Sequence, residues 1–489
     1  MKTISKISII FLIIVGMFSC ELPDNVDPKS PRQVPTEALF TNAQRYLGDY
    51  IGTMNYNIQV NHFLVRYWTE VTYLTEVRYD FADRSIPDTW WDVMYRNVLT
   101  DFEEAKKQVN NTTFANEAKK KNQLAMIDIS QVYAWHVLVE TFGNIPYSEA
   151  LDPDNSTPKY DDAETIYRDL LSRLTTDINR LTSGEPSFGD NDLIFNGDPD
   201  KWRKFAASLK FRMAMRLADY DKTYSVEQAN AALSTGVFEE GEGAIFQFTS
   251  TPPHVHSIYQ WFEIDGRTDV VPTKPFVDSL ASLNDPRMKY LVDTSFGPPQ
   301  PYAIQVNKYA EVAHFQKQFF EPNFENVFTD YAEMEFLKAE AAARGGYNVS
   351  GTAEAHYENA IEASIRYWAH NYEKFTGETI SESDLQTKVN DYLAQDAVQY
   401  DANNWKKSIG IQKWIALYNR PTESWASWRV LEHPQFDFTE DMGTLYQQVP
   451  VRYPYPFSES RLNTSNYNSA VEAMGGEDSP TVNLFWDVE

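Results

Sequence analysis

Cysteine is almost absent from this sequence of 489 residues, which contains only Cys20. An exported protein with a single cysteine cannot form an internal disulfide bond, so its fold must depend on other interactions. Basic residues are also few: 43 Lys and Arg face 70 Asp and Glu, which gives a formal net charge of −27. Nucleic-acid binding requires a basic surface that neutralises phosphates, so we expect no nucleic-acid partner. The same charge would repel an anionic membrane surface.

Motifs for common catalytic and cofactor sites are missing as well. The sequence contains no Gly-rich phosphate loop, no GxSxG nucleophile elbow and no HExxH zinc helix. The only close histidine pair, His254 and His256, stands in a Pro-containing segment without an evident third ligand, so we expect no metal. The 70 acidic residues form too many carboxylate pairs for a glycosidase pair to be selected by counting. The residues alone thus give no sign of a catalytic site or of a cofactor.

The single cysteine follows a short apolar segment at the start of the chain. Lys2 and Lys6 precede an apolar run over residues 7–18, and Ser19 comes directly before Cys20. A membrane-spanning helix needs about 20 apolar residues, so this run is instead typical of a secretory signal. The arrangement resembles a bacterial lipoprotein signal, in which the cysteine becomes the acylated first residue. The alternatives are an ordinary signal peptide with a chance cysteine, or a buried thiol.

The remaining chain divides by composition into a tether and one large domain. Residues 1–19 form the predicted signal peptide, and residues 20–35 are polar, contain four prolines and predict an extended tether. Residues 36–489 predict a single, mostly α domain, with helical hairpins at about 36–235 and 329–432. Between them, residues 236–328 are rich in Pro, Gly and aromatics and predict an irregular insertion, and residues 433–489 predict an irregular tail. Apolar residues at three- and four-residue spacing predict helices over 36–50, 88–109, 117–141, 161–181, 199–220, 225–233, 330–344, 352–372, 381–400, 404–418 and 422–430.

One helical hairpin can be predicted in more detail. Asp330 is a suitable N-cap, and Glu333 three residues later could reach back to complete a capping box. The paired glycines 345 and 346 then end the helix before Thr352 begins the next one. Its residues match positions of a tetratricopeptide unit. Ala341, Ala353 and Ala360 are small enough for the two helices to approach closely, and Tyr357 is expected to fill the gap between them. The alternative is a generic helical hairpin.

Several longer segments occur in a specific order. They are FGNIPYSEAL (142–151), LNDPRMKYLVD (283–293), YAEMEFLKAEAAARGG (331–346), IGIQKWIALYNRPTESWASWRVLEHP (409–434) and the segment 450–487. Behind a lipoprotein signal, this set resembles the SusD/RagB family of Bacteroidetes outer-membrane lipoproteins, from about Thr36 to the end. The resemblance implies a mostly α fold of tetratricopeptide-like hairpins with an irregular, loop-rich ligand-binding insertion.

The resemblance also implies a function. Family members are non-catalytic, lipid-anchored at the cell surface, and capture oligosaccharides for a SusC-like TonB-dependent transporter in the outer membrane. Some branches capture peptides, so a peptide-capturing lipoprotein is one alternative, and a surface glycosidase is another. The family has no fixed motif for its ligand residues, so these residues must be chosen from local chemistry.

Aromatic residues form two candidate ligand patches. Sugar rings pack their C–H groups on flat aromatic faces, while polar side chains bind their hydroxyls. The first patch covers residues 65–91, where Trp68, Tyr79 and Trp90 are the candidates. For each aromatic residue, the alternative is packing in the core.

The second patch covers residues 252–269 in the irregular middle of the chain, where binding residues are more often displayed. We expect Trp261 to be an exposed stacking residue there. Its neighbours supply the other candidates, which are Tyr259, Phe262, Asp265 and Arg267.

A third aromatic group is assigned to the core. Trp414, Trp425 and Trp428 lie on two successive predicted helices and are expected to pack these helices together. A structural role is also expected for the turn Asp285–Pro286–Arg287, where Arg287 can pair with a buried acid.

Overall fold

The computed structural model of the protein describes residues 34–52, 60–305, 308–439, 441 and 443–488. Cys20 and the predicted signal peptide lie outside the described residues, as does the tether apart from its last two residues. From Thr36 onwards the chain forms one compact unit, and it is mostly helical, as predicted. Within the described ranges, no helix is both long enough and apolar enough to cross a membrane.

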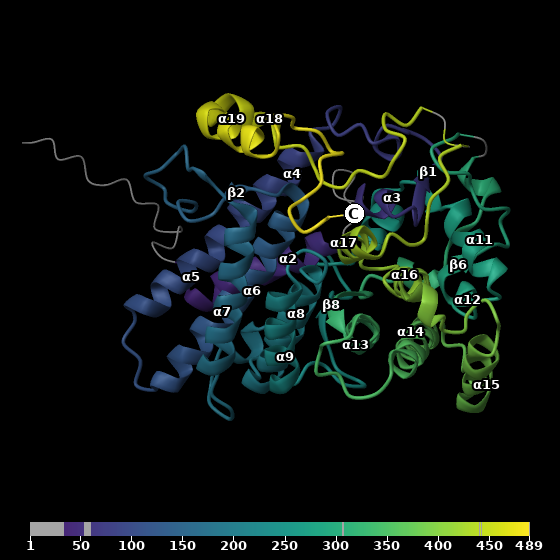
Figure 1. Cartoon of the computed structure of the whole chain (residues 1–489), viewed down its shortest axis with the longest axis horizontal. Helices are drawn as coiled ribbons and strands as arrows, with labels where there is room; N and C mark the ends of the chain where they lie inside the picture. Colours follow the sequence, from purple (N-terminus) through teal and green to yellow (C-terminus); the bar gives the residue numbers. More distant parts are fainter. Residues whose placement is uncertain (1–33, 53–59, 306–307, 440, 442, 489) are drawn as a thin grey trace, which may run out of the picture. The chain divides into compact units, whose positions relative to one another are not determined.

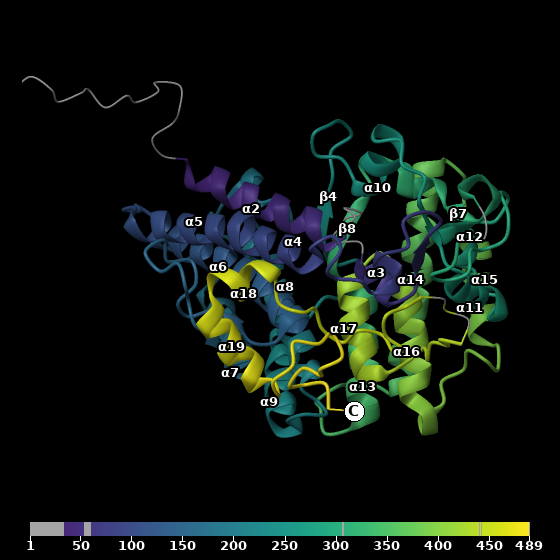
Figure 2. The ribbon, with the colours of Figure 1, turned by 90° about the horizontal axis from the view of Figure 1, so that it is seen from above.

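The first half of this unit consists of antiparallel helices (Figures 1 and 2). Side chains at the N-terminal ends of three of them, Asn116, Asp162 and Asp198, accept hydrogen bonds from free N–H groups of the first turn, which fixes where each helix begins. The central helix α6 contacts α5, α7 and α8 and is buried on nearly every side. The helices are α2 (Thr36–Ile51), α3 (Val60–Leu64), α4 (Ile86–Asp92), α5 (Thr100–Asn111), α6 (Glu117–Phe142), α7 (Ala163–Arg180), α8 (Pro199–Arg216) and α9 (Lys222–Thr235).

One predicted helix is interrupted in the structure. The pattern predicts a continuous helix over 88–109, but a π-helical segment, η2 (Val93–Leu99), separates α4 from α5. The hydroxyl of Thr100 donates to the carbonyl oxygen of Tyr95, five residues earlier, at 2.8 Å. A π turn inserts an extra residue, so the apolar pattern continues across it with little change.

The hairpin of α13 (Tyr331–Arg344) and α14 (Ala353–Thr376) confirms the predicted packing. Ala341 and Ala360 are fully buried, and Tyr357 fills the space beside them while its hydroxyl donates to the Val398 carbonyl oxygen. The predicted N-cap also forms, because the Asp330 carboxylate accepts from the Glu333 N–H at 2.9 Å. The helices α15 (Glu382–Leu393), α16 (Trp405–Ala416) and α17 (Pro421–Leu431) follow.

The middle and the tail are irregular but contain short elements. The described part of the chain contains four two-stranded antiparallel pairs: β1 (Trp68–Glu70) with β5 (Val270–Pro272), β2 (Ile145–Pro146) with β3 (Tyr160–Asp161), β4 (Gly243–Gln247) with β8 (Glu325–Asp330), and β6 (Val292–Asp293) with β7 (His314–Phe315). Three short helices, α10 (Ser257–Tyr259), α11 (Lys274–Ser282) and α12 (Met288–Leu291), lie among these strands in the sequence. The tail contains α18 (Phe457–Leu462) and α19 (Thr464–Ala473), which the sequence pattern does not predict. Only Ala470 is buried in these two helices, so they have no apolar stripe to recognise.

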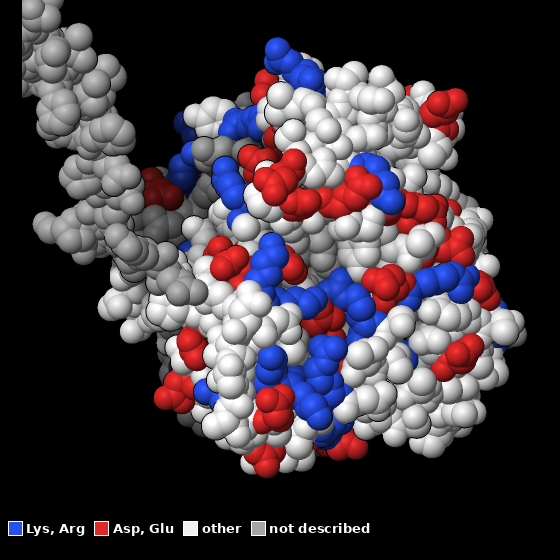
Figure 3. Space-filling model, turned by 90° about the vertical axis from the view of Figure 1, so that its left-hand side faces the viewer, with Lys and Arg blue, Asp and Glu red and all other residues white. Residues whose placement is uncertain are grey.

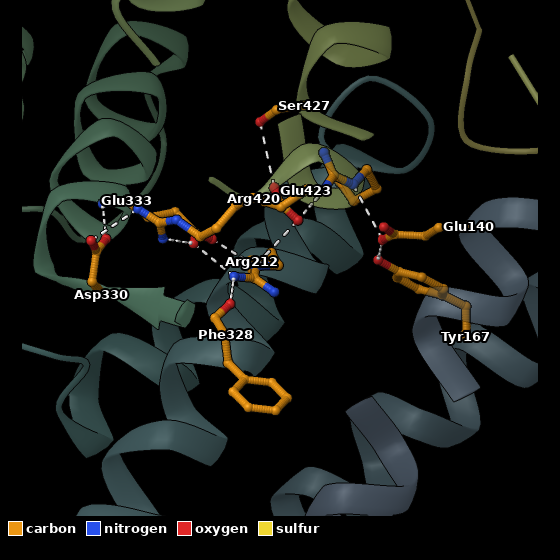
Figure 4. A network of polar contacts seen from close by, with 10 residues as sticks. Glu140, Tyr167, Arg212, Phe328, Asp330, Glu333, Arg420, Glu423 and Ser427 are labelled. Atoms are coloured by element: carbon orange, nitrogen blue, oxygen red, sulfur yellow. Dashed lines mark hydrogen bonds and ion pairs between the residues drawn. The ribbon is translucent and has the colours of Figure 1, made fainter. Parts of the chain in front are cut away.

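A buried network of ion pairs joins helices from both halves of the chain (Figure 4). Arg212 of α8 donates from Nε to the Glu333 carboxylate of α13 at 2.6 Å, and from Nη2 to the Phe328 carbonyl oxygen at 2.6 Å. Arg420, directly before α17, donates to the same carboxylate at 3.0 Å and to Asp330 at 2.9 Å. Glu333 therefore does not close the predicted capping box, because two guanidinium groups occupy its carboxylate.

The network continues through Glu423 to α6. Arg212 Nε lies 3.4 Å from a Glu423 oxygen, and Arg216 donates to the other oxygen at 2.9 Å and to Glu140 at 3.2 Å. The Tyr167 hydroxyl donates to Glu140 at 2.7 Å. Burial alone would raise the pKa of Glu423, but Arg216, Arg212 and a buried lysine outweigh it and lower that pKa. Alternating charges thus run unbroken from Glu140 to Asp330.

Basic residues are gathered locally despite the negative net charge. Figure 3 shows Lys and Arg side chains across the middle of one face, with Asp and Glu side chains around them. Ion pairs between neighbouring helices bring basic and acidic side chains together. Lys106 of α5 and Arg173 of α7, for example, both pair with Asp128 of α6, at 2.5 and 2.9 Å. Opposite charges in the helical half therefore neutralise one another in part.

Candidate ligand-binding site

The structure brings the two predicted aromatic patches together. β1 of the first patch pairs with β5 at the end of the second, with Trp68 opposite Pro272 and Glu70 opposite Val270. The Val71 N–H donates to the Asp269 carbonyl oxygen at 2.8 Å, which extends the contact beyond the strands. Segments about 200 residues apart in the sequence therefore contribute to one surface.

Three of the predicted rings in the first patch lie in the core. Trp68, Tyr79 and Trp90 are each about 1% exposed. The Trp68 indole N–H donates to the Tyr418 hydroxyl, and the Trp90 indole N–H donates to the Tyr453 hydroxyl. The expectation that these rings are displayed for stacking is wrong, because all three side chains are almost fully buried.

Trp261 is also less accessible than expected, with an exposed fraction of 6%. A π-helical turn, η4 (Gln260–Ile264), directs its indole N–H to the Asp269 carboxylate at 3.0 Å. The Arg267 guanidinium lies 4.6 Å from the centre of the indole ring and also pairs with Asp269. Trp261 is therefore a supporting residue beneath Arg267 rather than an exposed stacking face.

The remaining candidates of the second patch have separate surroundings. Phe262 is half-buried and packs edge-on against Phe320, with ring centres 5.3 Å apart. Asp265 is exposed and accepts a hydrogen bond from the Gln260 side chain at 2.8 Å. Tyr259 is half-buried at the end of α10. Of the five candidates in the second patch, Trp261 and Arg267 are brought together, through their shared partner Asp269.

The exposed ring of this surface belongs to Tyr73, which was not among the selected candidates. Tyr73 is 57% exposed and has a φ of 62°, a left-handed conformation that is rare for a residue with a bulky side chain. The guanidinium carbons of Arg267 and Arg84 lie 5.7 and 5.8 Å from the centre of its ring. We name Tyr73, Arg84 and Arg267 the tyrosine platform.

Buried carboxylates hold both arginines of the platform. Arg267 pairs with Asp269, and Arg84 Nε lies 2.8 Å from an oxygen of Glu76. Glu70 lies beside them, and burial first, then the carboxylates of Glu76 and Asp269, raises the pKa of Glu70 well above its usual range. Each arginine of the platform is therefore held in position by one buried carboxylate.

This arrangement suits a saccharide. The ring of Tyr73 offers a face on which sugar C–H groups can pack, and the two guanidinium groups supply fixed donors for hydroxyl oxygens. Strained backbone of the kind found at Tyr73 persists where the surrounding structure enforces it, and it is concentrated at functional sites. The platform can bind and orient such a ligand.

The structure also places the residues assigned to the core or to a metal. Trp414 and Trp425 are buried, as predicted, whereas Trp428 is only half-buried and stacks on Phe436. Arg287 forms the predicted buried pair, with Asp285 at 2.6 Å. Among the described residues, no group of three or more His, Cys, Asp and Glu side chains is arranged to hold a metal ion.

Comparisons with known proteins agree with this fold. The family model described as "Starch-binding associating with outer membrane", SusD-like, matches residues 28–456. The chain therefore belongs to the SusD-like family. No curated protein sequence matches it.

Solved structures resemble the protein over nearly its whole length. A chitin-binding protein has 25% sequence identity and a TM-score of 0.80, covering 93% of this chain and 100% of its own. A SusD homologue from Bacteroides uniformis has 21% identity and a TM-score of 0.78, covering 92% and 99%. A chitin-binding SusD homologue from Flavobacterium johnsoniae has 20% identity and a TM-score of 0.74, covering 92% and 99%.

Proposed function

We propose that this protein is a cell-surface lipoprotein that captures oligosaccharides and delivers them to a SusC-like TonB-dependent transporter in the outer membrane. The observation that carries the binding proposal is the exposed ring of Tyr73 between two arginines that buried carboxylates hold in place. Membership of a family described as starch-binding supports a glycan ligand. The two chitin-binding neighbours make oligosaccharides of N-acetylglucosamine a natural first probe.

Binding on this surface requires no catalysis. The carboxylates of Glu76 and Asp269 next to the platform are engaged by arginines, and Glu70 has a raised pKa in a buried position. A glycosidase instead needs two carboxyl groups on either side of the scissile bond, one to donate a proton and one to act as base or nucleophile. We therefore propose a binding protein without a cofactor.

Titration calorimetry of the purified protein with starch-derived and chitin-derived oligosaccharides tests the proposal. We expect saturable binding of at least one oligosaccharide and no new reducing ends after prolonged incubation. A peptide library serves as the comparison, because the peptide-capturing alternative has the same architecture. Binding of peptides without any oligosaccharide would contradict the proposal, and the release of reducing ends would show a glycosidase.

The proposed anchor gives a second test. Replacing Cys20 with alanine removes the only thiol that could be acylated, while the domain from residue 36 onwards is unchanged. We expect the variant to fold normally but to leave the membrane fraction, since stable attachment of a lipoprotein depends on its acyl chains. Incorporation of radiolabelled palmitate is the direct measurement. Equal labelling of the variant and the parent protein would exclude Cys20 as the acylated residue.

A further inference from the structure

A second candidate site lies between the segment 79–88 and the C-terminal tail. The structure contains a cleft of about 610 Å³ there, which lies within the size range of typical ligand pockets. The Leu445 N–H donates to the Arg78 carbonyl oxygen at 3.0 Å, so the tail is attached to the segment that forms the opposite wall. The walls are rich in aromatic side chains: Tyr79, Phe81, Tyr446, Tyr455, Phe457 and Tyr467.

The charged residues that line this cleft have one sign. They are Asp80, Asp88 and Asp478, and the described residues lining the cleft include no Lys, Arg or His. Asp88 accepts the N–H groups of residues 457 and 458, and Asp478 pairs with the buried Arg452 at 2.7 Å. Among the described residues, Asp80 accepts N–H groups only from residues 82 and 83, at 3.1 Å, so of the three aspartates it has the most acceptor capacity left there.

The outer rim of the cleft is unusually apolar. Phe457 is 66% exposed and Leu445 is 61% exposed, although burial of such side chains is favourable. The Arg461 guanidinium lies 5.4 Å from the centre of the Phe457 ring, so this ring already accepts a cation within the same chain. Burial raises the pKa of the Tyr446 hydroxyl, and the charges of Asp80 and Glu477 raise it further. Two carboxylates therefore lie near that ring.

Aromatic faces and carboxylates are the groups that recognise an organic cation. An ammonium group is attracted to the face of an aromatic ring and pairs with a carboxylate. We propose that the cleft binds an amino sugar whose amine is unacetylated, within an oligosaccharide of hexosamine units. This proposal rests on the proposed function, from which it takes the saccharide nature of the ligand, and it specifies the kind of saccharide. It also separates the two sites by chemistry, because the carboxylates at the tyrosine platform are paired with its arginines.

Two oligosaccharides of equal length test this proposal: an oligomer of glucosamine and the same oligomer with every amine acetylated. We expect the full-length protein to bind the glucosamine oligomer at least tenfold more tightly. Replacing Asp80 with asparagine or Phe457 with alanine should each weaken this binding at least tenfold without changing the melting temperature. Binding to the acetylated oligomer should remain unchanged.

Matched controls account for the change of charge and of apolar surface. Asp391→Asn changes the net charge by the same amount on the exposed surface of α15, and Leu462→Ala removes an exposed apolar side chain that does not line the cleft. Neither control should alter binding of the glucosamine oligomer. A lysine-rich peptide is included as the other source of ammonium groups, and tighter binding of this peptide than of the glucosamine oligomer would overturn the proposal.

Failure of this proposal can be distinguished from failure of the proposed function. Equal affinities for the two oligomers, or wild-type affinity in the Asp80 and Phe457 variants, would overturn the amino-sugar site while oligosaccharide capture stands. Absence of binding to every saccharide tested would overturn both.

Discussion

Replacing Glu333 with alanine should lower the free energy of unfolding by about 3–5 kcal/mol, as expected when one partner of a buried ion pair is removed. The Glu333 carboxylate is fully buried and serves both Arg212 and Arg420. Without it, Arg212 keeps its longer contact with Glu423 at 3.4 Å, its hydrogen bond to a carbonyl oxygen and its position 6.0 Å from the centre of the Tyr133 ring. The lost stability reflects a guanidinium group left without sufficient compensation in the interior.

Urea unfolding, followed by tryptophan fluorescence, measures this effect. The matched control is Glu382→Ala, because the Glu382 side chain is 67% exposed although it pairs with Arg366. An exposed pair contributes about 0–1 kcal/mol, so the control should remain close to the parent protein. A loss below about 1 kcal/mol for Glu333→Ala, on the scale of that exposed pair, would show that solvent or rearranged side chains compensate Arg212.

Replacing Tyr73 with alanine should weaken oligosaccharide binding at least tenfold, which corresponds to about 1.4 kcal/mol. The side chain is mostly exposed and contributes little to the core, so the melting temperature should change by no more than a few degrees. Tyr73→Phe is the conservative variant, since it keeps the aromatic face and removes only the hydroxyl. We expect this variant to retain most of the affinity.

Trp261→Ala provides the structural contrast. Trp261 is buried, donates to Asp269 and supports Arg267, so its removal should cost about 3–5 kcal/mol of stability. Titration of the oligosaccharide identified by the screen, together with thermal unfolding, separates the two variants. Wild-type affinity in Tyr73→Ala would place the ligand elsewhere on the protein.

Local sequence signals predicted most of the helical framework. Helix α13 begins at Asp330 and ends before the paired glycines because capping is determined by residues within a few positions of each end. The same local pattern failed at residues 93–99, where the π-helical segment keeps an apolar face without keeping the period of an α-helix. It also could not show that Glu333 would pair with Arg212, which is 121 residues away.

The candidate site was predicted only as a region. Residues 65–91 do contain the platform tyrosine, but composition does not reveal which ring in an aromatic segment faces outward. That outcome depends on the pairing of β1 with β5 and on the left-handed backbone at Tyr73. We chose tryptophans because they often stack on sugars, but the chosen tryptophans lie in the core, since large aromatic side chains are mainly buried.

The ion network of Figure 4 determines when this chain can complete its fold. Synthesis proceeds from the N-terminus, so α8 emerges with Arg212 and Arg216 more than a hundred residues before Glu333 and about two hundred before Glu423. Until those acids arrive, Arg212 lacks both of its carboxylate partners and Arg216 has Glu140 of α6 but not Glu423, so burial of this face of α8 is less favourable. Full packing of α8 therefore depends on the C-terminal half of the chain. For the surface lipoprotein proposed above, such late closure suits export in an unfolded state.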